Sequence, residues 1–426
     1  MVQGVEPADA PQALTRRNRF VLALLLGGAC ALGPFSVDMY LPALPTVAKD
    51  LQASASAIAL TITTFLVGLA VGQIFAGPLS DTYGRRRPLL VGTGLFAVAA
   101  GLGALAPSAP VLIVLRAIAG LSAAAGIVIT NAVVTDHYRG KESARFLSRL
   151  VLVSGLAPII APIVGGQVLR FTSWRGIFGV LAGLGVVLFV GLLFWLKESL
   201  PPERRAVHGV TGSLRTMGML SRDARFTGLA VSAALTSTAF FGYLAASSFI
   251  FQGTYGASPA MFSLLFSINA MGMLLSSQLN HFLLRWWSPR VLLGAGLCVC
   301  VLAGLALLAV TLIGGLGIVA LSVPLFVLVS AVNFVMPDST ALALSLHPEW
   351  AGSASAYFGT FRLGLGALAT PLVAIGGATS ALPLAIVVAV STIGALGVFA
   401  SVARRLGSPP AAPLSAAEAT CEMTLG

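Results

Sequence analysis

Long apolar runs, separated by short polar segments, fill the chain from residue 20 to residue 403. A membrane-spanning helix needs about 20 consecutive apolar residues, and runs of about this length recur throughout. The predicted spans are residues 20–44, 56–79, 88–106, 109–135, 147–170, 174–196, 226–252, 258–284, 289–313, 316–346, 352–376 and 381–403. The pattern therefore predicts an all-α membrane protein with 12 transmembrane helices.

A polar segment divides these spans into six and six. The predicted organisation is an N-terminal tail at 1–19, a six-helix bundle at 20–196, a linker at 197–225, a second six-helix bundle at 226–405 and a C-terminal tail at 406–426. The first run follows Arg16, Arg17 and Arg19, as the apolar part of a signal peptide follows positive charge. It is too long for that role and many spans follow, so we expect an uncleaved first helix.

Composition agrees with a membrane protein, because 57% of the residues are hydrophobic and 9% are charged, against about 25% charged in soluble domains. The net charge of +11 would fit a nucleic-acid binder, but its distribution argues against one. Of the 25 Lys and Arg residues, 20 fall on the predicted side of both termini, three on the other side and two inside spans. This asymmetry predicts cytoplasmic termini and contact with anionic lipid headgroups. Heavy use of Ala and Gly, and of Arg over Lys, suggests a bacterial source with a GC-rich genome, so the expected location is a bacterial inner membrane.

The densest charge of the first half lies between the second and third predicted spans, in Gly77-Pro-Leu-Ser-Asp-Thr-Tyr-Gly-Arg-Arg-Arg-Pro-Leu89. Gly77 and Pro78 are expected to end a helix. Gly84 can adopt the positive φ of a tight reversal, and Pro88 can occupy the first turn of the next helix. Composition alone favours a short polar loop between two membrane helices.

The order of residues in this loop suggests more than a connection. Gly77, Asp81, Gly84, Arg85 and Arg86 form the pattern Gly-x-Leu-x-Asp-x-x-Gly-Arg-Arg. This pattern resembles the signature of the loop after the second helix in major facilitator superfamily transporters. The resemblance implies a gate in which the carboxylate lies near the N-terminus of another helix and near loop arginines, a placement that the helix dipole favours.

Two acid–arginine combinations fall inside predicted spans, where ionisable groups are costly and usually functional. Asp38 lies near one end of the first span, and Arg116 lies at a similar depth in the fourth. We expect them to pair, either as a static link between helices or as a carboxylate that exchanges a proton or a cationic substrate. Asp338 in the tenth span and Arg362 in the eleventh are predicted to form a similar pair in the second half.

The fifth predicted span combines helix breakers with small residues. Pro158 and Pro162 each remove a backbone donor and are expected to bend the helix. Gly155, Gly165 and Gly166 are expected to let a neighbouring helix approach closely. A tightly packed, bent helix and a kink that seals a pathway against leakage are both compatible with this pattern.

Further motifs resemble one branch of the superfamily, the Bcr/CflA-type drug-resistance transporters. Asp38-Met-Tyr-Leu-Pro-Ala-Leu-Pro45 is typical of that branch, Arg116 with Gly120 is similar to a fourth-helix motif associated with proton transfer, and residues 158–166 resemble an antiporter motif. The resemblance implies a proton-coupled exporter of drugs or antibiotics that works by alternating access. It implies a small-molecule drug substrate, a monomer, and a proton gradient in place of any cofactor.

A drug pocket of this kind is expected to be apolar and aromatic with a few polar groups. The candidate lining residues are Phe35, Tyr40, Asn131, Phe240, Phe241, Tyr243, Gln252 and Asn269. An enzyme is not expected, because the one Gly-Lys pair precedes Glu142 and so lacks the Ser or Thr of a P-loop, and no His-Glu-x-x-His or Gly-x-Ser-x-Gly motif occurs. A metal site is not expected either, because the four histidines fall near predicted membrane ends or in loops. Two alternatives stay open at this point: a proton-coupled transporter of metabolites or amino-acid derivatives, and a membrane receptor or scaffold.

Overall fold

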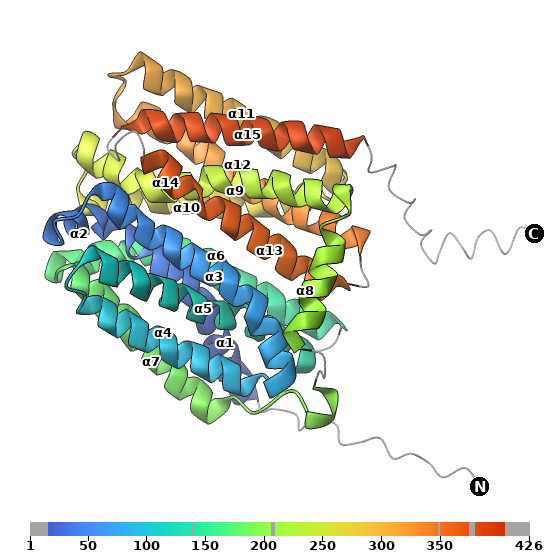
Figure 1. The fold of residues 1–426 in the computed structure, drawn as a ribbon. Coiled ribbons are helices and arrows are strands. Elements are labelled where there is room, and N and C mark those ends of the chain that lie inside the picture. Colours follow the sequence, from blue (N-terminus) through green and yellow to red (C-terminus); the bar gives the residue numbers. More distant parts are fainter. Residues whose placement is uncertain (1–15, 138–139, 206–208, 348–349, 375–379, 405–426) are drawn as a thin grey trace, which may run out of the picture.

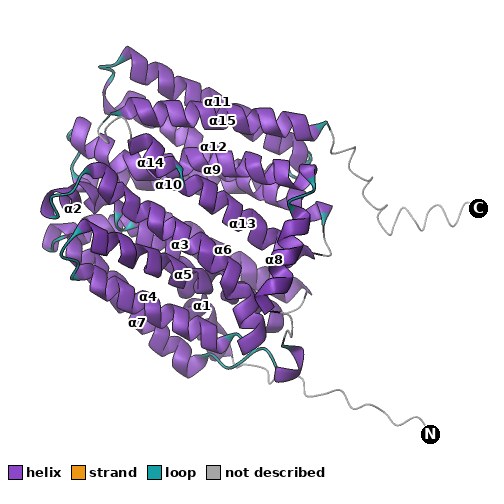
Figure 2. Ribbon diagram, in the orientation of Figure 1, coloured by secondary structure: helices purple, strands orange, loops and turns teal. Residues whose placement is uncertain are grey.

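The computed structural model describes residues 16–137, 140–205, 209–347, 350–374 and 380–404, and the regular structure in these ranges is helical (Figure 2). The first half contains α1 (Arg16–Asp38), η1 (Leu41–Ala43), α2 (Leu44–Asp50), α3 (Ala55–Tyr83), α4 (Arg86–Ala104), α5 (Ala109–His137), α6 (Gly140–Phe171) and α7 (Trp174–Trp195). The linker contains η2 (Pro202–Arg204) and α8 (Gly209–Leu220). The second half contains α9 (Ala224–Phe249), the π-helical turn η3 (Ile250–Thr254), α10 (Pro259–Leu283), α11 (Pro289–Ile313), α12 (Gly317–Leu346), α13 (Ala351–Ala367), α14 (Ala369–Ala374) and α15 (Ala381–Ala403).

The helices of each half pack mainly on one another. In the first half α5 lies against α3 and α4, α4 against α7, and α1 against α6; in the second, α12 lies against α10 and α11, and α15 against α9 and α11. The halves meet where α6 packs on α10 and where α3 packs on α13 and α14 (Figure 1). The linker helix α8 crosses the ends of the bundle and contacts both α3 and α13 (Figure 1).

Ten of the described helices are long and apolar enough to cross a membrane. The predicted span at 147–170 corresponds to α6, and the span at 352–376 corresponds to α13 and α14, which part at Leu368. The protein is therefore a multi-pass membrane protein, and the total of 12 spans stays a prediction. The chain enters α1 and leaves α15 at the end of the bundle where α8 lies (Figure 1).

Two predicted helix ends were wrong. Helix α3 continues through Gly77 and Pro78 to Tyr83, because packing against α5 holds the helix where local sequence would end it. That packing is unusually close, since a Cβ on Gly68 or Gly120 would collide with the backbone of the opposite helix. Helix α1 ends at Asp38 and not near Leu44; the chain then continues through η1 and α2.

Candidate functional site

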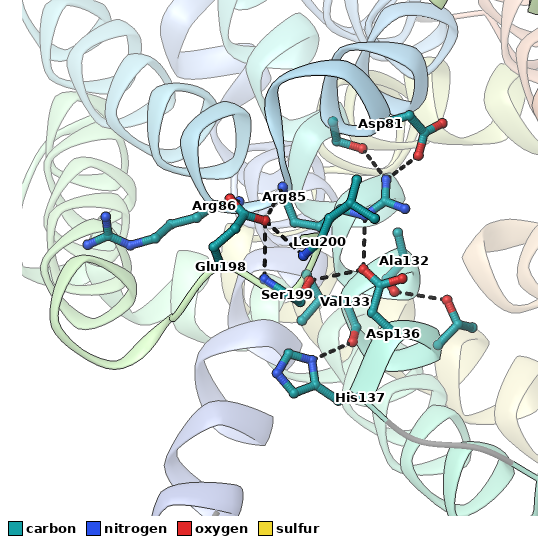
Figure 3. A network of polar contacts seen from close by, with 12 residues as sticks. Asp81, Arg85, Arg86, Ala132, Val133, Asp136, His137, Glu198, Ser199 and Leu200 are labelled. Atoms are coloured by element: carbon teal, nitrogen blue, oxygen red, sulfur yellow. Dashed lines mark hydrogen bonds and ion pairs between the residues drawn. The ribbon is translucent and has the colours of Figure 1, made fainter. Parts of the chain in front are cut away.

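The loop between α3 and α4 is held by one arginine that reaches two helices. The Arg85 guanidinium forms an ion pair with Asp81 on α3, donates from Nε to Asp136 Oδ2 on α5 at 3.0 Å, and donates from Nη1 to Ser80 Oγ at 2.8 Å (Figure 3). The predicted partnership between Asp81 and a loop arginine is thus present. Sequence analysis missed Asp136, although an acidic residue at the end of an apolar run was a usable signal.

A second carboxylate, that of Glu198 just after α7, accepts hydrogen bonds from the start of α4. Its Oε1 accepts from the backbone N–H groups of Arg85 (2.7 Å), Ser199 (3.1 Å) and Leu200 (3.1 Å), and its Oε2 accepts from that of Arg86 (3.2 Å) (Figure 3). Partial burial raises the pKa of Glu198, but these four backbone donors outweigh it, so the pKa lies below its ordinary value. An anion at a helix N-terminus also gains from the helix dipole.

Arg86 and Gly84 complete this network. The Arg86 side chain donates from Nε to the Leu196 carbonyl and from Nη2 to the Leu193 carbonyl, both at 2.8 Å, and so satisfies free carbonyls at the end of α7. Gly84 has a φ of +88°, as predicted, and a Cβ there would collide with the Glu198 carboxylate. The loop therefore fixes α3, α4, α5 and α7 to one another within the first half.

Arg116 is buried in the first half, but it does not pair with Asp38 as predicted. Its Nη1 donates to Ser36 Oγ at 2.5 Å, and its guanidinium carbon lies 4.3 Å from the centre of the Phe65 ring and 5.2 Å from that of Tyr40. Its Nε and Nη2 are buried and have no hydrogen-bond partner among the residues that the structure describes. Aromatic faces supply part of the stabilisation that the carboxylate was expected to supply.

Asp38 lies instead toward the second half. It is 6% exposed, and no cation pairs with it among the described residues. The Asp38 carboxyl group lies within electrostatic range of the Tyr243 hydroxyl of α9. The Tyr243 hydroxyl in turn accepts a hydrogen bond from Asn269 Nδ2 of α10 at 2.7 Å, and its ring stacks on Phe266 with centroids 5.7 Å apart. Two of the predicted residues, Tyr243 and Asn269, are therefore joined by a hydrogen bond, and Asp38 lies within electrostatic range of the first of them.

The other predicted ion pair was also wrong. Asp338 Oδ2 accepts a hydrogen bond from Asn280 Nδ2 of α10 at 3.0 Å. The Arg362 guanidinium contacts Met336 Sδ at 3.8 Å. Met336 and Asp338 are two residues apart on α12, which places them about 200° apart around the helix. Met336 can therefore face α13 only if Asp338 faces away from it.

In α6, two of the three predicted close approaches are present. A Cβ on Gly165 would collide with the Met39 carbonyl, and one on Gly166 would lie 2.6 Å from Ser263 Oγ of α10. Gly155 has room, since its Cβ would meet Leu274 at 3.7 Å, an ordinary contact. Pro158 and Pro162 lie inside a helix that continues from Gly140 to Phe171.

The remaining pocket candidates have different surroundings. Tyr40 is fully buried in the first half, against Thr61 and Phe178. Phe240 and Phe241 contact each other, with centroids 5.5 Å apart. Phe35 is partly buried and Asn131 is exposed on α5.

Gln252 joins the two halves. Its Nε2 donates to the Pro42 carbonyl at 3.0 Å and to Ser248 Oγ at 2.8 Å, while Ser248 Oγ donates to the Leu41 carbonyl at 2.6 Å. Gln252 therefore closes the end of the bundle at which η1 lies, a role that was not predicted for it.

Comparison with known proteins agrees with this architecture. A model of the Major Facilitator Superfamily matches residues 24–371. Two solved structures of low identity share the fold: a bacterial homolog of the human lysosomal transporter Spinster, inward-facing and unoccupied (TM-score 0.74, 15% identical, 93% of this chain and 100% of that one), and a D-xylose–proton symporter (TM-score 0.69, 14% identical, 89% and 97%).

Relatives of higher identity cover most of the chain. An uncharacterized MFS-type transporter of Bacillus subtilis is 37% identical and covers 92% of this chain and 98% of its own length. A bicyclomycin resistance protein homolog of Haemophilus influenzae is 30% identical (84% and 90%), and a chloramphenicol resistance protein of Pseudomonas aeruginosa is 32% identical (85% and 86%). The chain therefore belongs to the major facilitator superfamily and, within it, to the Bcr/CflA-type drug-resistance transporters, so it is a transporter and not an enzyme.

Proposed function

We propose that this transporter exports small, largely apolar drugs across a bacterial inner membrane in exchange for protons, with both termini in the cytoplasm. The observation that carries the proposal is Asp38, a buried carboxylate that pairs with no cation among the described residues and lies within electrostatic range of Tyr243 on the second half. A carboxylate buried in a membrane protein without a counter-charge is stable mainly when it binds a proton or a cation. The resistance proteins among the relatives support a drug as the substrate.

The proposed mechanism is alternating access around this site. Asp38 takes up a proton in one orientation of the halves and releases it in the other, and the drug moves in the opposite direction. One elementary charge moved through 100 mV supplies about 2.3 kcal/mol, enough for a concentration ratio of about fifty-fold. The proton gradient would then serve in place of ATP or any other cofactor.

The network around Arg85 has a defined part in this cycle. It ties α3 to α5, and Glu198 ties α4 to the end of α7, so the first half can move as one body. The polar contacts between the halves are separate from this network and include those of Gln252 and Ser248. Rocking of the halves would break these contacts while leaving the Arg85 network intact.

The test is drug susceptibility of an efflux-deficient bacterium that expresses the protein, with chloramphenicol, florfenicol and bicyclomycin as the first compounds. Wild type should raise tolerance, and both Asp38→Asn and a protonophore should abolish the increase. Asp50→Asn is the matched control, because Asp50 forms an exposed ion pair with Arg175 that is worth about 0–1 kcal/mol. Membrane levels of each variant are measured alongside.

Other outcomes would point elsewhere. Protection that survives in Asp38→Asn would keep the exporter and remove Asp38 as its proton site. Uptake of a labelled compound without protection would favour a metabolite transporter. Biological activity that survives in an Asp38→Asn/Arg116→Ala variant, without transport, would favour a receptor or scaffold.

A further inference from the structure

A second carboxylate is buried inside a membrane span, on the opposite half from Asp38. Asp338 lies on α12 and is 2% exposed, and its hydrogen-bond partner Asn280 on α10 is also 2% exposed. Among the described residues, no cation pairs with Asp338. An unpaired charge in such a place is costly, so the carboxylate needs either a cation or a proton.

One of the hydrogen-bond acceptors next to Asp338 lacks a donor. Asn280 Nδ2 donates both to Asp338 Oδ2 (3.0 Å) and to the Phe334 carbonyl (2.9 Å), while Asn280 Oδ1 is buried and has no partner in the described part of the chain. A buried acceptor without a donor is unfavourable. One proton on Asp338 would remove the buried charge and also create an O–H donor next to this free acceptor.

The ionisable side chains on the helices around α12 do not provide the missing cation. These helices are α9, α10, α11 and α13. Their ionisable residues are Arg225, Tyr243, His281, Arg290, Cys298, Cys300, Tyr357 and Arg362. Arg362 is directed to Met336, and Arg290 donates to the Ala403 carbonyl on α15. None of the eight forms a hydrogen bond or ion pair with the Asp338 carboxylate in the described structure.

The first half provides a useful contrast. There the second and fourth membrane helices, α3 and α5, are joined by Asp81, Arg85 and Asp136, so that a guanidinium lies between two carboxylates. In the second half the corresponding helices, α10 and α12, are joined by Asn280 and Asp338 with no arginine. Among the described residues of the second half, no positive charge therefore occupies the position that Arg85 has in the first half.

We propose that Asp338 is a second proton-binding group, which takes up and releases one proton in each transport cycle. Asn280 acts as its positioning partner. In uptake, a proton from hydronium forms the O–H bond on the carboxylate and leaves a water molecule, and release is the reverse. Asp338 lies eight residues before the end of α12, about 12 Å from the α8 end of the bundle. In the proposed orientation, this is the end through which Asp338 exchanges its proton with the cytoplasm. This inference rests on the proposed proton coupling.

The first test needs no drug. Infrared spectra of the full-length protein in detergent are recorded from about pH 6 to about pH 9, the range in which mainly carboxyl groups with a raised pKa titrate. Wild type should show protonated-carboxyl absorbance that disappears as the pH rises. Asp338→Asn should remove one component and Asp38→Asn a different one. Asn280→Leu should shift the frequency of the Asp338 component, because the hydroxyl loses its acceptor.

Asp338→Glu, which keeps a carboxyl group, should retain a titrating component even if the asparagine variant folds poorly. A spectrum in which Asp338→Asn removes no titrating component overturns the proposal. So does a component that Asp338→Asn removes but that stays protonated over the whole range, because that group never releases its proton.

The second test measures coupling in proteoliposomes with chloramphenicol as the probe. At a fixed chloramphenicol gradient, the membrane potential that stops net flux is inversely proportional to the number of protons exchanged per drug molecule. If wild type exchanges two, Asp338→Asn should exchange one, and this potential should double. An unchanged potential overturns the coupling role of Asp338. If wild type transports no compound, the proposed export function fails, while the infrared test still decides whether Asp338 exchanges a proton.

Discussion

Gly84 is the residue at which backbone geometry and the gating network meet. Its φ of +88° and ψ of 163° lie in a region that is essentially restricted to glycine, and its Cα faces the Glu198 carboxylate. Gly84→Ala should therefore lower the stability of the detergent-solubilised protein by about 1–3 kcal/mol and reduce drug tolerance of cells. Thermal unfolding measures the first effect. Gly179→Ala, whose Cβ meets nothing within 4 Å, should be neutral; equal losses in both variants would contradict this explanation.

The charge of Glu198 has its own signature in pH. Because the folded-state pKa is lowered, its stabilisation is complete above the unfolded pKa of about 4.3 and is lost as the pH falls through the folded value. At pH near 7, Glu198→Gln should cost about 0.3–1 kcal/mol, the usual worth of an anion at a helix N-terminus. Unfolding curves of variant and wild type should converge on acidification. Glu203→Gln, an exposed glutamate of the same linker, is the control, and a gap that widens in acid would refute the sign.

At the scale of elements, two glycines of helix α6 that look alike in the sequence have different surroundings in the structure. Gly165 lies against the Met39 carbonyl, which is backbone and cannot move aside, whereas Gly155 meets a flexible leucine side chain at an ordinary distance. Gly165→Ala should therefore push α6 away from the end of α1 and abolish most transport, while Gly155→Ala should keep it. Drug tolerance at matched membrane levels measures both. Full activity of Gly165→Ala would show that the α1–α6 contact is not needed.

Elements also show why proline had different effects along the chain. Pro78, Pro158 and Pro162 lie inside continuous helices, because packing on neighbouring helices compensates the missing hydrogen bond of each. Pro42 and Pro45 lie where α1 gives way to η1 and α2. Pro45 cannot supply the N–H that would bond the Leu41 carbonyl in an α-helix, so this carbonyl can accept from Ser248.

At the scale of the whole molecule, hydrogen bonds to the Leu41 and Pro42 carbonyls hold the two halves together at the η1 end of the bundle. Gln252→Leu removes the bond to the Pro42 carbonyl, which crosses between the halves and is worth about 0.5–1.5 kcal/mol, and the bond to Ser248, which lies within the second half. The population open at this end should rise by about two- to tenfold or more. Spin labels at Ala53→Cys and Ala257→Cys, in a background without the native cysteines, should then report longer distances between the halves.

Gln167→Leu is the matched control for this experiment, because Gln167 accepts a hydrogen bond from Arg170 of the same helix and, among the described residues, bonds to no other helix. An unchanged distance distribution in Gln252→Leu would mean that the closure depends on apolar packing. A change of equal size in Gln167→Leu would mean that loss of a polar side chain anywhere at this end has the same effect.

The membrane class, the position of most helices and the family followed from sequence alone, because apolar run length and the order of residues in the loop from Gly77 to Leu89 are local properties. The sequence also determined that Gly84 needs a positive φ, since that depends on the turn itself. Asp81 and Arg85, which pair within this loop, are only four residues apart, so their pairing could also be predicted from the sequence.

Only the tertiary structure decided which buried charges meet. Depth along a helix placed Asp38 level with Arg116, and Asp338 level with Arg362, but depth says nothing about direction around the helix axis. Rotation turned Arg116 to Ser36 and aromatic rings, Asp38 toward Tyr243, and Asp338 to Asn280. The two carboxylates are unpaired for that reason, and the proposed proton sites are a consequence of helix rotation that a one-dimensional pattern does not contain.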